Sequence, residues 1–105
     1  MDIRWLGQSC FTMTEGGTTL LVDPFLTDTP KGAADADSVE ADVIALTHGH
    51  FDHLGDTVDI ARRTGATVVA IMELAGELMG ALGEDHPVLD PNLGGTVKFD
   101  WGWIK

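Results

Sequence analysis

The ten residues THGHFDHLGD, at positions 47–56, hold three of the four histidines of this 105-residue chain. His48 and His50 are two residues apart, so in an extended segment both side chains point to one face. Asp52 and His53 follow, in what we expect to be the turn into a helix. One tetrahedral ion could hardly accept four groups from six residues, whereas two neighbouring ions could each bind a pair. The spacing therefore predicts a site for two metal ions.

These ligands would be imidazole nitrogens and carboxylate oxygens with no thiolate nearby, a set compatible with zinc, manganese or iron. Two ions that share a water lower its pKa, and they stabilise the charge that develops when hydroxide attacks an ester, amide, lactone or phosphoester. The predicted chemistry is hydrolysis. The alternative interpretation is that the histidines only cap a helix or lie on a solvated loop, but their number and their place after a buried strand favour the metal site.

The elements that must position this cluster begin with an antiparallel meander. Its three short strands are predicted for residues 3–7, 10–14 and 18–23. Residues 24–40 are rich in Pro, Asp, Gly and Ala and have no sustained period, so we expect a surface loop there. Residues 42–47, DVIALT, form a continuous apolar run that predicts a strand buried on both faces. The histidine cluster begins where this strand ends.

The rest of the chain predicts a βαβα unit. Leu54, Val58 and Ala61 recur at helical spacing before Gly65, which indicates a short helix. Further elements are a buried strand at 66–72, a helix at 73–83, and a final strand pair in 86–90 and 95–105. The fold class is therefore α/β (α+β), a meander followed by a βαβα unit, with the chemistry at the carboxyl end of a strand, where sites commonly lie.

The charge of the chain excludes some partners. Seventeen acidic residues against six basic ones give a formal net charge of −11, so we expect a nucleic-acid backbone to be repelled. This excess indicates either adaptation to high salt or simply an acidic surface. No apolar run approaches the roughly 20 residues that span a bilayer, and the N-terminus lacks the long apolar segment of a leader. With Cys10 as the single cysteine, we expect a cytoplasmic protein without a membrane partner.

The stretch LTHGHFDHLGD resembles the His-x-His-x-Asp-His signature of the metallo-β-lactamase fold superfamily. WLGQSCF, LLVDPFL and RTGATVVAI resemble its branch of small bacterial and archaeal metal-dependent hydrolases near L-ascorbate-6-phosphate lactonase. The resemblance covers essentially the whole chain. It implies that His48 and His50 ligate one ion and that Asp52 and His53 ligate the second, with Asp52 also orienting or deprotonating the attacking water.

Four residues outside the cluster also have chemical groups that could take part in the site. The resemblance implies that Asp23 supports the site by orienting a metal-bound imidazole, although a turn aspartate before proline is an equally good interpretation. Gln8 lies where many members of the branch have histidine; it either faces the substrate or, as we favour, serves the turn. We expect His86 to be a surface residue rather than a ligand. We expect Cys10 to be a small buried hydrophobe.

Members of this family are usually much longer, and their second half supplies the remaining ligands. We therefore interpret residues 1–105 as the N-terminal half of a hydrolase domain, half of a four-layer αββα sandwich, which would expose the inner face of its sheet. It would be completed by a separate C-terminal half or by a second copy in a homodimer, or it is a fragment. We favour a hydrolase seen in part, because residues 101–104 resemble the start of a further strand.

The function that we expect is hydrolysis of a small ester, lactone or phosphorylated substrate by a metal-activated hydroxide. The alternative is a non-catalytic metal-binding half-domain that assembles with a second half or a second copy. Whether the missing ligands exist in another polypeptide discriminates between the two.

Overall fold

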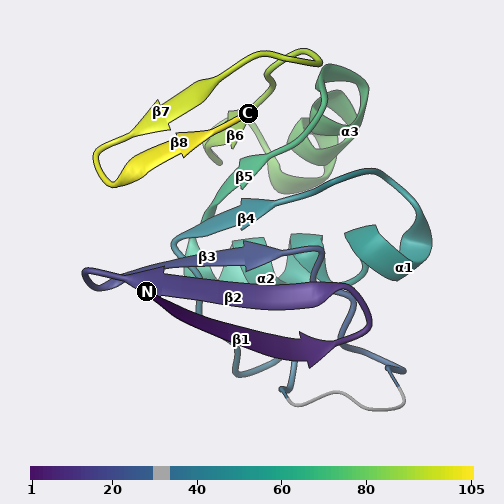
Figure 1. Ribbon diagram of the computed structural model, residues 1–105. Coiled ribbons are helices and arrows are strands. Elements are labelled where there is room, and N and C mark those ends of the chain that lie inside the picture. Colours follow the sequence, from purple (N-terminus) through teal and green to yellow (C-terminus); the bar gives the residue numbers. More distant parts are fainter. Residues whose placement is uncertain (30–33) are drawn as a thin grey trace.

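The computed structural model describes residues 1–29 and 34–105. The strands are β1 (Asp2–Gly7), β2 (Cys10–Glu15), β3 (Thr18–Val22), β4 (Val43–Ala45), β5 (Thr67–Val69), β6 (Val88–Leu89), β7 (Val97–Phe99) and β8 (Gly102–Ile104). The helices are α1 (Phe51–Leu54), α2 (Thr57–Thr64) and α3 (Met72–Leu82). Figure 1 shows one mixed sheet in the order β1-β2-β3-β4-β5-β6 and a separate β7-β8 hairpin. The predicted α/β class is confirmed.

The meander and the βαβα unit share this one sheet. β1, β2 and β3 pair antiparallel, as predicted. The turn between β2 and β3 consists of Gly16 and Gly17, whose φ angles of 59° and 83° are those of the type I′ turn that suits a two-residue hairpin. β3 then pairs with β4, β4 with β5, and β5 with β6, all parallel. The carboxyl ends of β3 and β4 therefore lie at the same edge.

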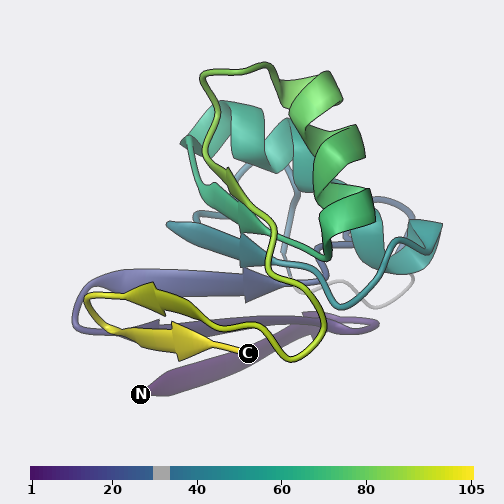
Figure 2. The same cartoon turned by 90° about the horizontal axis from the view of Figure 1, so that it is seen from above.

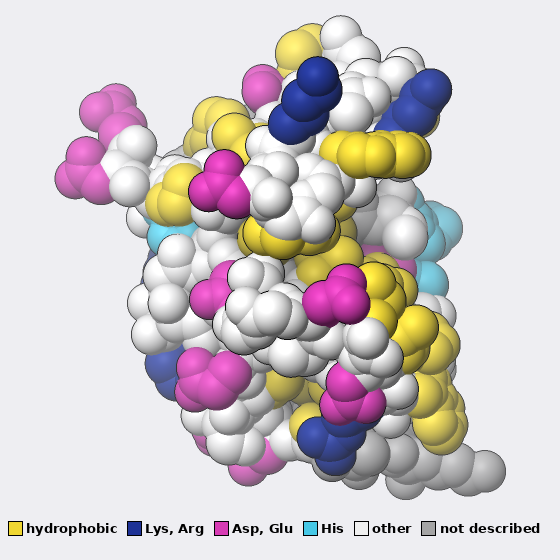
Figure 3. Space-filling model, turned by 60° about the vertical axis from the view of Figure 1, so that its left-hand side comes forward, with side chains coloured by type: hydrophobic (Ala, Val, Ile, Leu, Met, Phe, Trp, Pro, Cys, Tyr) yellow, Lys and Arg dark blue, Asp and Glu magenta, His cyan; other side chains and the backbone are white. Residues whose placement is uncertain are grey.

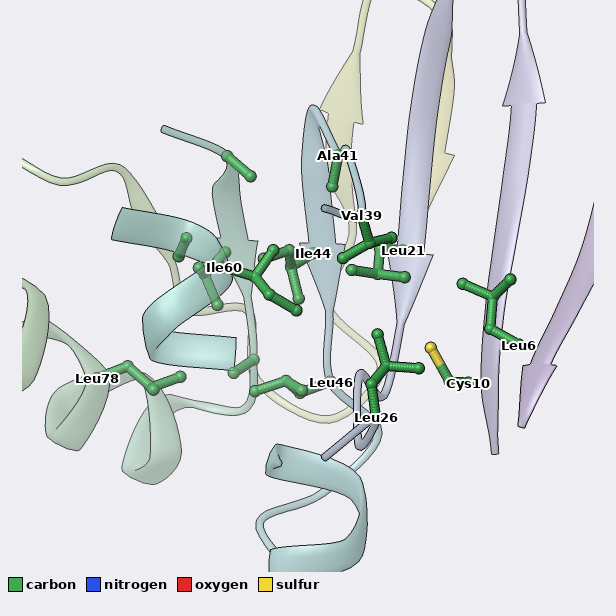
Figure 4. Packing of buried hydrophobic residues seen from close by; sticks show 14 of the residues in the cluster. Leu6, Cys10, Leu21, Leu26, Val39, Ala41, Ile44, Leu46, Ile60 and Leu78 are labelled. Carbon is green, nitrogen blue, oxygen red and sulfur yellow. The ribbon is translucent and has the colours of Figure 1, made fainter. Parts of the chain in front are cut away.

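The sheet separates two layers. Helices α2 and α3 cover one face, and the β7-β8 hairpin lies on the other (Figure 2). Because successive side chains of a strand alternate between faces, one set points to the helices. That set is buried and packs against Ile60 and Leu78 of the helices (Figure 4); it consists of Leu6, Cys10, Leu21, Ile44 and Val68.

We call the opposite side of the meander the outer face. The strand registers pair Ile3 with Met13, Trp5 with Phe11, Met13 with Leu20, and Phe11 with Val22, which places all six side chains on this face. Ile3, Trp5 and Phe11 are exposed, whereas Leu20 and Val22 are partly covered. The outer face is apolar as well as exposed.

Two sequence predictions need correction. The single helix expected after the cluster is divided, because α1 ends at Leu54 and Gly55 takes φ 45° and ψ −120° before α2 begins. The strand pair expected between 86–90 and 95–105 is wrong. β6 instead joins β5 in the main sheet, and residues 95–105 form a hairpin of their own, in which Val97 pairs with Ile104.

Other predictions hold. Helix α3 forms despite Gly76 and Gly80, both exposed with open space where a Cβ would lie, so their cost is one of helix propensity alone. Residues 24–29 and 34–40 contain no strand or helix, as predicted; residues 30–33 of that expected loop lie outside the described residues. Among the described residues, no helix combines the length and the apolarity needed to cross a bilayer.

Candidate metal centre

The predicted ligands lie where two parallel strands end. Asp23 directly follows β3, and the segment 46–50 follows β4, in which Ala45 pairs with Val22. Helix α1 then carries Asp52 and His53 alongside these strand ends (Figure 1). The order of the sheet thus brings residues 24 to 30 positions apart in the chain to one edge. In Figure 3, histidine side chains are seen at the surface of this edge, beside hydrophobic ones.

Asp23 is the buried centre of the cluster, with 2% of its surface exposed. Its Oδ1 accepts a hydrogen bond from the Thr47 backbone N–H at 2.8 Å. Its Oδ2 accepts one from the Thr47 hydroxyl at 2.6 Å and lies 2.8 Å from His53 Nδ1. Asp23 has a φ of 44°, a left-handed conformation that aspartate tolerates better than most residues. It therefore joins the end of β3 to the loop after β4 and to α1.

The contact between Asp23 and His53 fixes the hydrogen on the imidazole. A carboxylate oxygen only accepts hydrogen bonds, so Nδ1 of His53 must carry the hydrogen. Nε2 of the same ring then keeps its lone pair, and it lies 4.0 Å from Asp52 Oδ1. Histidines that bind metals typically donate their other N–H to a carboxylate in this way. The arrangement of His53 fits a metal ligand.

His48 lies between the other two histidines. Its Nε2 is 3.0 Å from His50 Nδ1, and its ring centroid is 4.6 Å from that of His50 and 4.1 Å from that of His53. One possible ligand atom from each of Asp23, His48 and His53 lies within 4.8 Å of the others. This group contains two of the four predicted ligands; of the other two, His50 contacts His48, and Asp52 lies 4.0 Å from His53. Their donor set of imidazole nitrogens and carboxylate oxygens suits zinc, manganese or iron.

Gln8 contacts the cluster from the turn between β1 and β2. Its Nε2 donates a hydrogen bond to Asp52 Oδ2 at 3.2 Å, and its backbone carbonyl accepts one from Trp5 Nε1 at 2.9 Å. Gln8 has a φ of 52°, so it is also a turn residue, as we favoured from the sequence. The turn thus places a side-chain amide on Asp52, which the sequence reasoning did not foresee.

Gly55 and Asp56 attach the cluster to the loop after β3. Asp56 occupies the position before α2, yet its carboxylate makes no capping bond to that helix. It instead accepts hydrogen bonds from the N–H groups of Leu26 and Thr27, both at 2.8 Å, and from the Thr27 hydroxyl at 2.6 Å. Asp56 therefore precedes α2 without capping it. A Cβ on Gly55 would lie 2.5 Å from Phe25 Cα, so only glycine permits this approach.

His86 and Cys10 lie outside the cluster. His86 contacts the carbonyl oxygen of Ala66 through Nε2 at 2.7 Å and is not among the grouped histidines. Cys10 is fully buried on the helix-covered face of the sheet, as predicted. Burial, followed by the charges of Asp23 and Asp56, raises the pKa of its thiol to about 12. The sequence reasoning missed Thr47, although a hydroxyl residue directly before the first histidine was the available signal.

Comparison with known proteins identifies the family. Residues 2–99 match the family model described as "Beta-lactamase superfamily domain". This chain belongs to the metallo-β-lactamase superfamily. A curated relative named UPF0173 metal-dependent hydrolase, from Shouchella clausii, is 50% identical over an alignment of 107 positions, which covers 100% of this chain and 45% of the relative. The chain thus spans about half the length of the curated relatives it matches.

Solved structures are also similar to this chain. A metallo hydrolase from the hyperthermophilic archaeon Ignicoccus hospitalis is 29% identical, with a TM-score of 0.80 over 93% of this chain and 42% of that protein. CmlA, a diiron β-hydroxylase from Streptomyces venezuelae, is 28% identical, with a TM-score of 0.67 over 91% of this chain and 21% of that protein. These two proteins, both similar to this chain, are named for different reactions, one as a hydrolase and one as a hydroxylase.

Proposed function

We propose that this chain carries the metal-binding part of a metal-dependent hydrolase that acts on a small ester, lactone or phosphorylated substrate. The observation that supports this most directly is the cluster at the ends of β3 and β4, in which Asp23 leaves the Nε2 lone pair of His53 free beside Asp52 and His48. The relative from Shouchella clausii, named a metal-dependent hydrolase, supports the same reaction class.

In this proposal, His48 and His50 hold one divalent ion, and Asp52 and His53 hold a second. Zinc or manganese suits these donors. Iron is a further candidate, which the likeness to a diiron enzyme supports. When bound, two such ions lower the pKa of a shared water and stabilise the charge that develops on the substrate. Asp52 orients the attacking water or accepts its proton, while Gln8 holds the other oxygen of that carboxylate at 3.2 Å.

We assign Asp23 to orientation rather than to metal binding. Both of its oxygens already have partners among Thr47 and His53, and the side chain is almost fully buried. A carboxylate in this position raises the basicity of the imidazole and fixes its ring. Its proposed role is therefore to keep His53 ready to bind a cation.

The proposal includes a further polypeptide surface. The relative from Shouchella clausii continues well beyond the matched region, and Ile3, Trp5 and Phe11 are exposed on the outer face. A complementary C-terminal half, or a second copy in a homodimer, would cover this face and supply further ligands. The net charge of −11 supports a protein that does not bind nucleic acid. As the sequence led us to expect, the proposal also includes a cytoplasmic location and no membrane partner.

Metal content tests the proposal. We expect about two ions per assembled unit by plasma mass spectrometry, with light scattering defining that unit. His48→Ala should remove most of the metal and any hydrolysis of chromogenic ester, lactone or phosphodiester substrates. His86→Ala is the matched control, because that histidine contacts Ala66 instead of the cluster. Unchanged metal content in His48→Ala would defeat the assignment.

The second candidate is a metal-binding half-domain without turnover. The exposed Ile3 and Trp5 of the outer face favour its assembly with a second half or a second copy. Addition of a separately produced C-terminal half of that relative distinguishes the two. Turnover that depends on both pieces supports the hydrolase, whereas a stable complex that binds metal and cleaves none of the test substrates supports the half-domain.

A further inference from the structure

Thr47 lies between the buried Asp23 and the exposed edge of the cluster. Its hydroxyl is 2.6 Å from Asp23 Oδ2 and 2.9 Å from His48 Nδ1. We propose that Thr47 is a positioning residue that sets which ring nitrogen of His48 carries the hydrogen. This inference rests on the proposed function insofar as it concerns metal binding.

The hydrogens available to these two contacts decide the tautomer of His48. A threonine hydroxyl has one hydrogen to donate and lone pairs to accept with. Asp23 Oδ2 can only accept, so the short contact of 2.6 Å takes the hydroxyl hydrogen of Thr47. The contact between Thr47 and His48 Nδ1 must then be donated by the ring. In the neutral ring, Nδ1 of His48 therefore carries the hydrogen. Nε2 keeps its lone pair, which in the metal-free chain accepts the contact from His50 Nδ1 at 3.0 Å.

The opposite tautomer would leave a conflict. If Nε2 of His48 carried the hydrogen, Thr47 would have to donate to Nδ1. Its oxygen and Asp23 Oδ2 would then face each other 2.6 Å apart as two acceptors with no hydrogen between them. A buried carboxylate that loses a hydrogen-bond donor is costly. The Thr47 N–H bond to Asp23 Oδ1 keeps the threonine in this position.

One buried carboxylate thus sets two imidazoles. Asp23 acts on His53 directly and on His48 through Thr47, and in both rings the lone pair is left on Nε2. The two rings lie 4.1 Å apart by their centroids, on the exposed side of Asp23. Two lone pairs prepared in this way by one aspartate are suited to cations bound next to each other.

Two substitutions test the role of Thr47. Thr47→Val keeps the size and branching of the side chain but removes the hydroxyl, whereas Thr47→Ser keeps the hydroxyl. In the metal-free chain at mildly alkaline pH, ¹⁵N NMR of the imidazoles reports the tautomer of His48. We expect Thr47→Val to shift His48 toward the Nε2–H form, and chelator competition to give a roughly tenfold weaker affinity for Zn²⁺. Thr47→Ser should match the unmodified chain in both measurements.

The outcomes separate this inference from the proposed function. A wild-type tautomer in Thr47→Val would overturn it, as would equal losses in Thr47→Ser and Thr47→Val, because a variant that keeps the hydroxyl would then lose as much as one that lacks it. If the valine variant does not fold, Thr47→Ala provides a second side chain without a hydroxyl. An unmodified chain that binds no Zn²⁺ would count against the proposed function alone, since the metal-free tautomer still decides the role of Thr47.

Discussion

The edge that carries the histidines and the outer face of the meander differ in how far their side chains find partners within this chain. At the edge, polar side chains from distant segments satisfy each other: Asp23 bonds to Thr47 and His53, and Asp56 bonds to Thr27. No buried side-chain nitrogen or oxygen of the described residues lacks a partner. On the outer face, by contrast, Ile3 is 58% exposed and Trp5 is 51% exposed.

The two regions also differ in how much of their surface this chain itself covers. The β7-β8 hairpin covers the outer face only in part and leaves a groove of about 460 Å³, lined by Met13, Leu20, Trp101 and Trp103 among others. Hydrophobic side chains also form a band on the side of the molecule seen in Figure 3. An apolar surface of this kind marks an interaction site or an aggregation liability. The edge is organised from within, whereas the outer face leaves apolar side chains uncovered.

Gly55→Ala should break the edge most severely. The new Cβ would lie 2.5 Å from Phe25 Cα and 2.7 Å from the Pro24 carbonyl oxygen, at a φ of 45°. Because backbone atoms must separate, we expect the free energy of unfolding to fall by about 3 kcal/mol or more. Denaturant unfolding measures this loss.

Gly65→Ala is the matched control for that substitution. Gly65 also has a positive φ, 75°, but has open space where its Cβ would lie. It should therefore show only the backbone penalty, about 1 kcal/mol. Equal losses in the two variants would mean that the close approach at Gly55 does not constrain the edge.

Asp23→Ala should have the next largest effect. It removes the acceptor for the Thr47 N–H, the Thr47 hydroxyl and His53, at a cost of about 2 to 3 kcal/mol in the free energy of unfolding. Asp42→Ala is the control at the opposite end of the same strands, where the exposed carboxylate accepts one bond from the Thr19 N–H. We expect that variant to lose less than about 1 kcal/mol. A smaller loss for Asp23→Ala than for Asp42→Ala would contradict the central role of Asp23.

The sequence predicted the parts of this edge that are local. The three histidines and Asp52 lie within six residues, so their proximity needed no knowledge of the fold. The contact of Asp23 with His53 spans 30 positions and was expected only from the family resemblance. The contact of Gln8 with Asp52 spans 44 positions and depends on a left-handed turn residue, which no local pattern specifies. Long-range polar contacts are what the sequence alone could not predict.

The same distinction applies to the strands. β1, β2 and β3 were predictable because alternating apolar residues are separated by glycine turns, and β4 because of its continuous apolar run. β6 has only two residues, and its partner in β5 lies 20 positions earlier. So short a strand carries no period, and its place is decided by the packing of α3 across the sheet. The pairing of the last three strands was therefore missed.

The pH dependence of stability tests the burial of Cys10 on the helix-covered face of the sheet. Its thiol has a pKa of about 12 in place of the ordinary 9.0, chiefly because it is buried. Above pH 9.0 the unfolded chain loses a proton that the folded chain retains, so the free energy of unfolding should decrease as the pH rises toward 12. Cys10→Ala should flatten this decrease, as measured by denaturant midpoints across the range. An identical pH dependence in both chains would show that the thiol is not responsible.

The smallest effect on stability is expected on the outer face, with Ile3→Ser. Because Ile3 is 58% exposed, the isolated chain should lose no more than about 0.5 kcal/mol of unfolding free energy. The same change should weaken binding to a complementary half or a second copy, as measured by light scattering or calorimetry. Arg4→Ser, on the opposite face of β1, is the control and should leave binding intact. A large loss of stability would mean that this chain itself already buries Ile3, and the contrast between a self-sufficient edge and a partner-dependent face would fail.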